Sequence, residues 1–154
     1  MPVAKPIPDD YPRVMPYLSV IGATDAIEFY RSVFGATERI RLEGPDGKLG
    51  HAELQIGDSV VMLADEFPDM GGRSPKTLGG TPVTLTIYVT DVDQVFAHAL
   101  QEGATEVRAV QDQFYGDRSG IFEDPFGHRW NVATHIEDVS AAEMEKRAAQ
   151  AAPG

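Results

Sequence analysis

Apolar residues recur at helical spacing in two stretches of this chain, and shorter segments with the pattern of strands follow each stretch. The first helical stretch opens at Thr24-Asp25 and stops at Gly35. The second opens at Thr90-Asp91, about 66 residues later, and stops at Gly103. Threonine and aspartate are favourable N-caps, and glycine accepts the left-handed backbone that often ends a helix. The pattern therefore predicts that one structural unit occurs twice.

Strand-like segments surround both predicted helices in the same order. They cover residues 13–20, 37–42, 49–56 and 59–64 in the first unit, and 83–89, 105–110, 119–123 and 128–134 in the second, where a polar loop is expected over 111–118. Both units then have the order βαβββ, and a repeat of this length indicates two copies of one supersecondary unit. We predict an α+β fold in which paired βαβββ modules form a curved mixed sheet around a groove.

The same patterns predict the boundaries along the chain. A Pro-rich arm (1–12) precedes a single domain over 13–135, which consists of module one (13–65), a Gly- and Pro-rich loop (66–81) and module two (82–135). Residues 136–154 follow as a tail, in which Ser140 and Glu143 have the spacing of a capping box for a polar helix that extends to Gln150. The loop over 66–81 is either a linker or a lid.

The alternation within each predicted strand indicates which side chains line the groove. Aliphatic residues are expected to pack on the helices, Val14 and Val83 among them, and the residues between them point the other way. The predicted lining is Met15, Tyr17, Ser19, His51, Glu53, Gln55, Val60, Met62, Ala64, Thr84, Thr86, Tyr88, Arg129, Asn131 and Ala133. Such a mixture of hydroxyls, thioethers, amides and one imidazole suits a small organic molecule.

Composition excludes several classes of partner. The net charge of −11 repels phosphate backbones and anionic lipids, so neither nucleic acid nor a membrane surface is an expected partner. No apolar run approaches the length of a membrane span, and the first residues lack the apolar stretch of a secretory signal, which favours a cytoplasmic location. The chain has no cysteine, which excludes disulfides and thiolate metal sites.

Several short motifs resemble one known family. The segments 26–30, before Phe34-Gly35, and 123–128, near the end of the second unit, are similar to those of the vicinal oxygen chelate superfamily, which includes glyoxalase I, extradiol dioxygenases and bleomycin-resistance proteins. The segments 50–54, 117–120 and 124–130 most resemble its PhnB-like branch. The resemblance covers roughly residues 13–135 and implies the fold, whereas the scaffold hosts many chemistries.

The resemblance also allows a test for a metal site. Metal enzymes of this superfamily carry His, Glu or Gln on the first and fourth strands of each unit, and the matching positions here are Met15, Met62, Thr84 and Asn131. A divalent ion prefers imidazole or carboxylate ligands, whereas this set offers only the amide carbonyl of Asn131. We therefore expect no metal cofactor at the usual place.

His51 and Glu53 form the strongest chemical pair in the sequence, because they lie two residues apart on one strand face. His51 could act as a general base that Glu53 orients, or the two side chains could be an ordinary solvated polar pair. A third interpretation is a displaced Zn, Ni, Mn or Fe site built on this pair with help from His128 or Asp65.

Two tyrosines and one arginine complete the set of candidates. Tyr17 and Tyr88 could offer hydroxyl groups to a ligand or find structural partners. Arg118 could bind a carboxylate or phosphonate through its planar guanidinium, or pair with Asp117 or Asp124 and fix the predicted loop.

These observations predict a protein similar to the bleomycin-resistance type, which binds a small organic molecule without a metal. His51 and Glu53 are the candidate catalytic residues, and the expected ligand-binding residues are Met15, Tyr17, Gln55, Met62, Thr84, Thr86, Tyr88, Arg118 and Asn131. One alternative is a glyoxalase-like lyase, isomerase or transferase that uses the displaced metal set. Another is a metal-free enzyme in which His51 or Tyr88 transfers a proton. The resemblance further implies a homodimer.

Overall fold

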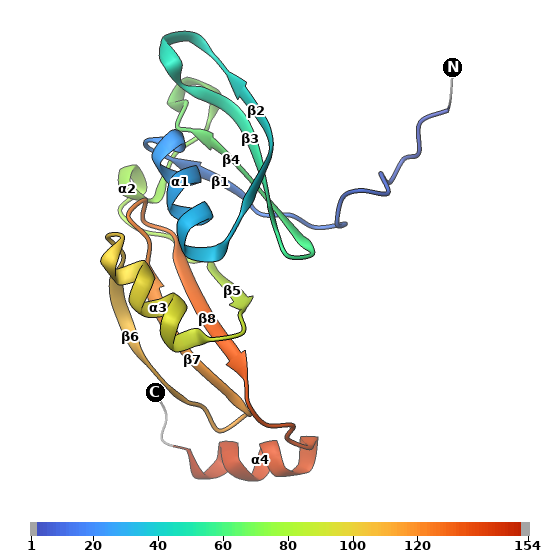
Figure 1. Ribbon diagram of the computed structural model, residues 1–154, viewed down its shortest axis with the longest axis vertical. Helices are drawn as coiled ribbons and strands as arrows, with labels where there is room; N and C mark the ends of the chain where they lie inside the picture. The colour runs from blue at the N-terminus through green and yellow to red at the C-terminus, as the bar shows by residue number, and fades with distance from the viewer. Residues whose placement is uncertain (1–2, 152–154) are drawn as a thin grey trace. The chain divides into compact units, whose positions relative to one another are not determined.

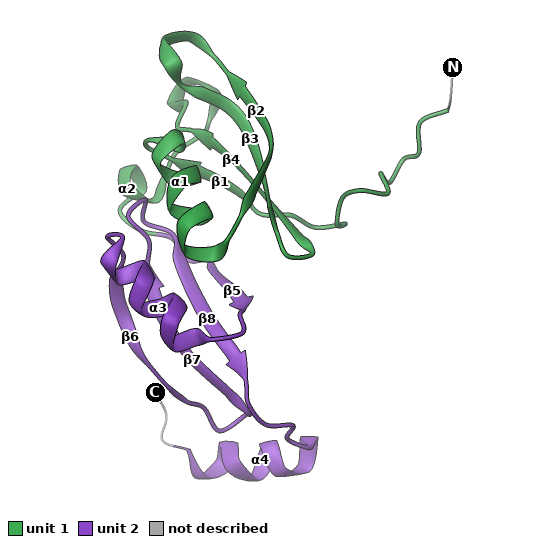
Figure 2. Ribbon diagram, viewed as in Figure 1, with its two compact units in different colours: residues 1–80 green, residues 81–154 purple. Residues whose placement is uncertain are grey.

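The computed structural model describes residues 3–151. Residues 1–2 and 152–154, which belong to the predicted arm and tail, lie outside the described residues. The chain divides into two compact units, residues 1–80 (unit 1) and 81–154 (unit 2), and each unit contains one four-stranded sheet (Figure 2). No helix within residues 3–151 has the length and apolar character that crossing a bilayer requires.

Unit 1 has the predicted order βαβββ (Figure 1). Its elements are β1 (Tyr17–Val20), α1 (Ala23–Phe34), β2 (Thr37–Glu43), β3 (Leu49–Ile56) and β4 (Ser59–Asp65). The sheet has the strand order β1-β4-β3-β2, in which β1 is parallel to β4 and the other pairs are antiparallel. A single 3₁₀ turn (Pro45–Gly47) joins β2 to β3.

Unit 2 repeats this topology and adds a C-terminal helix. Its elements are β5 (Thr84–Tyr88), α3 (Val92–Gln101), β6 (Thr105–Asp112), β7 (Asp117–Glu123), β8 (Arg129–His135) and α4 (Ala141–Gln150). The strand order is β5-β8-β7-β6, with β5 parallel to β8. The two units confirm the predicted α+β fold of two βαβββ modules, and α4 begins at the predicted cap, where Ser140 Oγ accepts the N–H of Glu143.

Each sheet carries its long helix on one face. In unit 1, α1 packs on β3 and β4, and the side chains beneath it are fully buried aliphatic groups, as the alternation predicts. In unit 2, α3 packs on β6, β7 and β8, and the ring of Phe96 meets that of Phe122 edge to face with centroids 5.7 Å apart. We call the opposite side of each sheet its helix-free face.

The long helix of unit 1 begins differently from the prediction. Neither Thr24 nor Asp25 caps α1, because the helix begins at Ala23, and its N-cap is Gly22 with a left-handed backbone (φ 92°) and no side-chain cap bond. Asp65, at the end of β4, instead accepts the N–H groups of Gly22 and Ala23 through Oδ1, at 3.1 and 2.9 Å. The carboxylate of a sheet residue thus accepts the N–H groups at the start of the helix that a local N-cap residue would otherwise accept.

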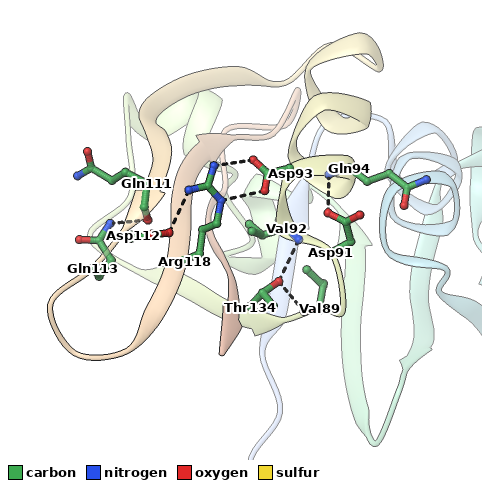
Figure 3. A network of polar contacts seen from close by, with 10 residues as sticks. All are labelled: Val89, Asp91, Val92, Asp93, Gln94, Gln111, Asp112, Gln113, Arg118 and Thr134. Carbon is green, nitrogen blue, oxygen red and sulfur yellow. Dashed lines mark hydrogen bonds and ion pairs between the residues drawn. The ribbon is translucent and has the colours of Figure 1, made fainter. Parts of the chain in front are cut away.

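In unit 2 the predicted cap is correct. Asp91 caps α3 by accepting the N–H of Gln94, and Thr134 Oγ1 in β8 accepts the N–H of Val92 and donates to the carbonyl of Val89 (Figure 3). The register also shows that Tyr17 beside Met62 in unit 1 corresponds to Thr86 beside Asn131 in unit 2. Thr24-Asp25 and Thr90-Asp91 are therefore not equivalent positions, and the predicted period was a few residues too short.

Several predicted strand ends were also wrong. Val14 and Val83 were expected to pack on helices, but they lie outside β1 and β5 and are 87% and 58% exposed. The predicted polar loop over 111–118 is mostly strand, since β6 extends to Asp112 and β7 starts at Asp117. The second error has a physical cause, because polar residues in a paired strand carry no local signal that separates them from a loop.

The loop over 66–81 contains a 3₁₀ turn (Pro68–Met70) and the short helix α2 (Pro75–Leu78), which contacts β1. Ser74 caps α2, is fully buried, and donates its backbone N–H to Glu66 Oε1 at 2.6 Å. This part of the loop is therefore folded onto unit 1 by specific hydrogen bonds. Its action as a lid stays a prediction.

Candidate functional site

A continuous chain of hydrogen bonds crosses the helix-free face of unit 1. The hydroxyl of Tyr17 lies 2.8 Å from Nδ1 of His51, and Nε2 of His51 lies 2.8 Å from Oε2 of Glu53. The three residues come from β1 and β3, which are not neighbours in the sheet, and Met62 of β4 stands between them in register. Directly paired positions point to the same face, so Met62 lies beside both Tyr17 and Glu53.

Exposure changes along this chain from one end to the other. Tyr17 is 52% exposed, whereas Glu53 is only 4% exposed. A carboxylate that is buried to this degree needs compensating donors. Glu53 has a second one, because the hydroxyl of Tyr11 donates to its Oε1 at 2.7 Å.

Tyr11 comes from the segment before β1 and is held there by Arg39. The guanidinium carbon of Arg39 lies 4.4 Å from the centroid of the Tyr11 ring, and Arg39 also donates to Asp10 and to Gln55. The register of β2 against β3 shifts between Glu38 and Ile40, so Arg39 is the extra residue of a β-bulge. Bulges re-aim a side chain, and this one brings a cation to the site.

The environment determines the charge of Glu53. Burial by itself raises the pKa of this carboxyl, but the hydrogen bonds from His51 and Tyr11 outweigh that cost, so its pKa lies below the usual value. Glu53 is therefore ionised at neutral pH. Burial and the nearby charge of Glu53 raise the pKa of Tyr17, which keeps its phenol protonated. The hydrogen bond to Glu53 is the main cause that raises the pKa of Tyr11.

The other predicted residues of unit 1 lie near this chain. Gln55 follows Glu53 on the same face of β3 and accepts from Arg39 at 3.4 Å, while its amide donates to the carbonyl of Gly57. Met15 precedes β1 and is half-buried, as is Met62. The structure therefore brings together His51, Glu53, Tyr17 and Met62, with Gln55 at the edge of the group.

The helix-free face of unit 2 holds a different polar chain. The hydroxyl of Tyr88 donates to Oδ2 of Asp117 at 2.7 Å, and Oδ1 of Asp117 lies 2.9 Å from Nδ1 of His135. Nε2 of His135 lies 2.7 Å from Asp138. The hydrogen bond to Asp117 is the largest cause that raises the pKa of Tyr88, and bonds to Asp117 and then Asp138 raise the pKa of His135.

Three further predicted positions of unit 2, Thr84, Thr86 and Asn131, make few hydrogen bonds among the described residues. Asn131 donates from Nδ2 to Thr86 Oγ1 at 3.4 Å, and its Oδ1 is buried with no hydrogen-bond partner among the described residues. Thr84 is exposed at the start of β5. Arg108, which the sequence did not suggest, bonds Ser119 through Nη2, whereas its buried Nε finds no partner within residues 3–151.

Arg118 lies on the other face of its sheet. Its guanidinium forms two hydrogen bonds to Asp93 of α3, at 2.8 and 2.9 Å, and a third to Asp112 at 3.0 Å (Figure 3). Arg118 therefore forms ion pairs that fix local structure, as one of the two interpretations predicted. Its partners are Asp93 and Asp112, however, and not Asp117 or Asp124. Since these bonds point it toward α3, we do not assign Arg118 a role in ligand binding.

The residues present do not fit the metal of the related enzymes. In the sheet, Tyr17 lies directly beside Met62, and Thr86 lies directly beside Asn131. If these two residues, and not Met15 and Thr84, occupy the metal positions of the first strands, the site still contains no imidazole or carboxylate. No group of three His, Asp or Glu side chains that could hold a metal ion occurs within residues 3–151.

The displaced metal set finds no support in the geometry. Both ring nitrogens of His51 are engaged, one with Tyr17 and the other with Glu53. Asp65, the proposed helper, accepts backbone N–H groups through both oxygens, including that of Leu49 at 2.7 Å. These donors would have to leave before either side chain could bind a cation.

Comparison with known proteins agrees with this architecture. The family model described as the Glyoxalase/Bleomycin resistance protein/Dioxygenase superfamily matches residues 14–132. The chain therefore belongs to the glyoxalase/bleomycin resistance/dioxygenase superfamily, as the sequence motifs suggested.

Three relatives illustrate the range of similarity. An uncharacterised protein of Mycobacterium tuberculosis is 49% identical over 137 residues, which cover 87% of this chain and 81% of the relative. A crystal structure of a protein from Pseudomonas aeruginosa has a TM-score of 0.67 at 23% identity and covers 82% of this chain and 99% of that one. A PhnB protein from Bacillus cereus, described as a putative 3-demethylubiquinone-9 3-methyltransferase, has a TM-score of 0.63 at 16% identity, with coverage of 80% and 99%. At these identities the solved structures support the fold alone.

Sequence reasoning missed several residues in and around the two polar chains, His135 and Asp138 among them. Tyr11 was placed in a flexible arm, although it bonds Glu53 across 42 positions of sequence. Arg39 reaches the site only because of a bulge, and Asp117 was considered only as a partner for Arg118. A long-range hydrogen bond leaves no local pattern, so no signal in the sequence could have found Tyr11.

Proposed function

We propose that this protein binds a small organic molecule on the helix-free face of unit 1, without a divalent metal. The observation that carries the proposal is Tyr17, a half-exposed residue whose hydroxyl heads a hydrogen-bonded chain that ends at buried Glu53. The bond from His51 to Glu53 fixes the imidazole, and the imidazole in turn fixes the Tyr17 hydroxyl. A recognition site requires polar groups that are held in one orientation in this way. Met62 supplies an apolar contact next to that hydroxyl.

The charge of the chain limits the class of ligand. Net charge is −11, and Arg39, a cation beside Glu53, is already placed over Tyr11 and bonded to Asp10. A negatively charged ligand would therefore meet repulsion without a free cation at the site. A neutral or cationic molecule with a hydrogen-bonding oxygen or nitrogen and a flat or apolar part fits best.

A thermal-shift screen of neutral aromatic and heterocyclic molecules tests the proposal, because ligands that bind the native state raise the melting temperature. A hit should lose most of its shift in Tyr17→Phe, which keeps the ring, and keep it in Tyr115→Phe, a matched change in the hairpin of unit 2. A hit that responds equally to both variants would place the binding site elsewhere.

Elemental analysis tests the second half of the proposal. The purified protein should contain no stoichiometric Zn, Ni, Mn or Fe, and a chelator should leave the thermal shift of a confirmed ligand unchanged. Stoichiometric metal together with loss of binding on chelation would contradict metal-independent binding and would restore the displaced metal set around His51 and Glu53.

The family resemblance also leads us to propose a homodimer in solution. Exposed apolar side chains support this, including Leu42 (59% exposed) on β2, one of the two edge strands of the sheet in unit 1. Size-exclusion chromatography with light scattering should give a mass of about twice 16.7 kDa. A single monomeric peak at micromolar concentration would contradict the homodimer.

A further inference from the structure

We infer that Tyr17, His51 and Glu53 form a proton relay that makes the Tyr17 hydroxyl a reactive group, able to take a proton from a neutral, weakly acidic organic molecule. The inference deepens the proposed function, because it concerns the same site and adds chemistry to binding. It rests on the direction of each hydrogen bond in the chain, which the geometry and the charge of Glu53 determine together.

The direction is fixed at the buried end. An ionised carboxylate can only accept hydrogen bonds, and Glu53 accepts from Tyr11 at Oε1. The ring nitrogen Nε2 of His51, 2.8 Å from Oε2, must therefore carry the hydrogen and donate it. We take His51 as the neutral imidazole, which has one N–H, so Nδ1 is left with a lone pair and accepts.

The exposed end follows from that tautomer. With Nδ1 as an acceptor, the 2.8 Å contact to Tyr17 is a hydrogen bond that the phenol donates. The oxygen of Tyr17 then has its lone pairs directed away from His51, and the residue is 52% exposed. We infer that a molecule bound on this face reaches that oxygen with an acidic hydrogen.

Unit 2 contains a natural control for this arrangement. Tyr88 is also a phenol on a helix-free face and is slightly more exposed, at 62%. Its hydroxyl donates to the carboxylate of Asp117, whereas that of Tyr17 donates to an imidazole. Imidazole accepts a proton readily near neutral pH and a carboxylate does not, so only Tyr17 can hand on its proton under those conditions.

The proposed step balances as follows. The substrate gives a proton from an O–H or an acidic C–H bond to the oxygen of Tyr17, and its bonding electron pair stays on the substrate as an anion. At the same time the original phenol proton passes to Nδ1 of His51, and the resulting imidazolium is stabilised by Glu53 2.8 Å away. The reverse transfer returns a proton to the product. In this scheme Tyr17 is the catalytic residue, and His51 and Glu53 act through it.

Chemical labelling of the two tyrosines tests the relay without a known ligand. N-acetylimidazole acetylates phenols: the phenol oxygen bonds the acetyl carbon, the bond from that carbon to imidazole breaks, and the phenol proton leaves with the assistance of any base. Limited labelling followed by peptide mass spectrometry should show Tyr17 acetylated on the order of tenfold faster than Tyr88. If labelling follows exposure, with Tyr88 equal or faster, the relay is wrong.

Two variants test whether the faster acetylation of Tyr17 depends on the relay or only on its position at the surface. Glu53→Gln keeps the shape of the side chain but removes the charge that fixes the tautomer, and Tyr11→Phe keeps the charge and removes only one donor. The first should abolish the preference for Tyr17, and the second should leave most of it. An unchanged preference in Glu53→Gln would overturn the inference, provided that circular dichroism shows the native fold.

Nitrogen NMR of the histidine side chains supplies a measurement that needs no variant. At neutral pH, His51 should be in the Nε2–H tautomer with Nδ1 unprotonated, and the opposite tautomer would contradict the relay. Both tests use the free protein, so their failure leaves ligand binding intact. Failure of the thermal-shift screen, in contrast, would count against binding and not against the relay.

Discussion

The two sheets have the same strand topology, but the side chains on their helix-free faces differ in chemistry. Each carries a tyrosine from its first strand, bonded to a polar side chain of a neighbouring antiparallel pair. In unit 1 a histidine lies between the tyrosine and the carboxylate, whereas in unit 2 the carboxylate Asp117 lies between the tyrosine and the histidine. The order of the groups decides whether a phenol proton has an acceptor that works at neutral pH.

The structural support of the two helices differs in a similar way. A single residue, Asp65, accepts three backbone N–H groups in unit 1, while Asp91 and Thr134 share the corresponding work in unit 2. A duplicated fold therefore keeps its hydrogen bonds satisfied by different side chains in each copy. The concentration of bonds on one residue makes unit 1 the more sensitive to a single change.

The largest expected effect follows from that concentration. Asp65→Ala leaves the N–H groups of Gly22, Ala23 and Leu49 without their acceptor and should lower the free energy of unfolding by about 2–4 kcal/mol. Denaturant unfolding measures it. Asp65→Asn, which keeps one carbonyl oxygen for Gly22 and Ala23, should recover about half of the loss. An Asp65→Ala loss no larger than that of Thr134→Val would remove the contrast between the units.

A smaller loss is expected for the shared cap. Thr134→Val keeps the shape but removes the hydroxyl that accepts from Val92 and donates to Val89, at a cost of about 1–2 kcal/mol. Asp91 still accepts from Gln94, so α3 should remain formed in the circular dichroism spectrum. Thr134→Ser retains the hydroxyl and serves as the matched control, with a stability close to that of the original chain.

The two tyrosines should also respond differently to loss of their hydroxyls. Tyr88→Phe removes a donor from Asp117, which is only 7% exposed, and should cost about 1 kcal/mol. Tyr17→Phe should cost less, since His51 is partly exposed and water can replace the phenol at its Nδ1. Parallel urea titrations compare the two values, and equal losses would show that the two phenols have equivalent surroundings.

The smallest effect concerns pH. The carboxylates of Asp117 and Asp138 raise the pKa of His135 above its unfolded value of 6.5. The stabilisation that this imidazolium provides is fully present below pH 6.5 and is lost as pH rises through the higher folded pKa. The melting temperature should fall over this window more steeply for the original chain than for His135→Gln. Parallel curves for the two proteins would argue against a charged His135.

Most of the fold could be predicted because the pattern that encodes it is local. Buried positions such as Ala52 and Leu54 alternate with polar neighbours along β3, and Gly35 provides the left-handed stop of α1 with φ 69°. The strand ends were less predictable, since pairing with a neighbour extends β6 and β7 through polar residues such as Asp112 and Asp117.

The candidate site was predicted only in part, for a physical reason. His51 and Glu53 could be paired from their spacing on one strand, whereas the contact with Tyr17 depends on the strand order, in which β4 separates β1 from β3. Tyr11 and Arg39 depend on chain segments that no periodicity describes, namely the residues before β1 and a bulge.

The contact between Tyr11 and Glu53 has a practical consequence for anyone who purifies this protein. An affinity tag fused at the N-terminus lies ten residues from Tyr11, whose hydroxyl donates a hydrogen bond to the buried carboxylate of Glu53. A tag that draws this segment away would leave Glu53 with one donor and would change the very group under study. A tag is better placed after α4, because there it is attached far along the chain from Tyr11 and does not pull on the segment that contacts Glu53.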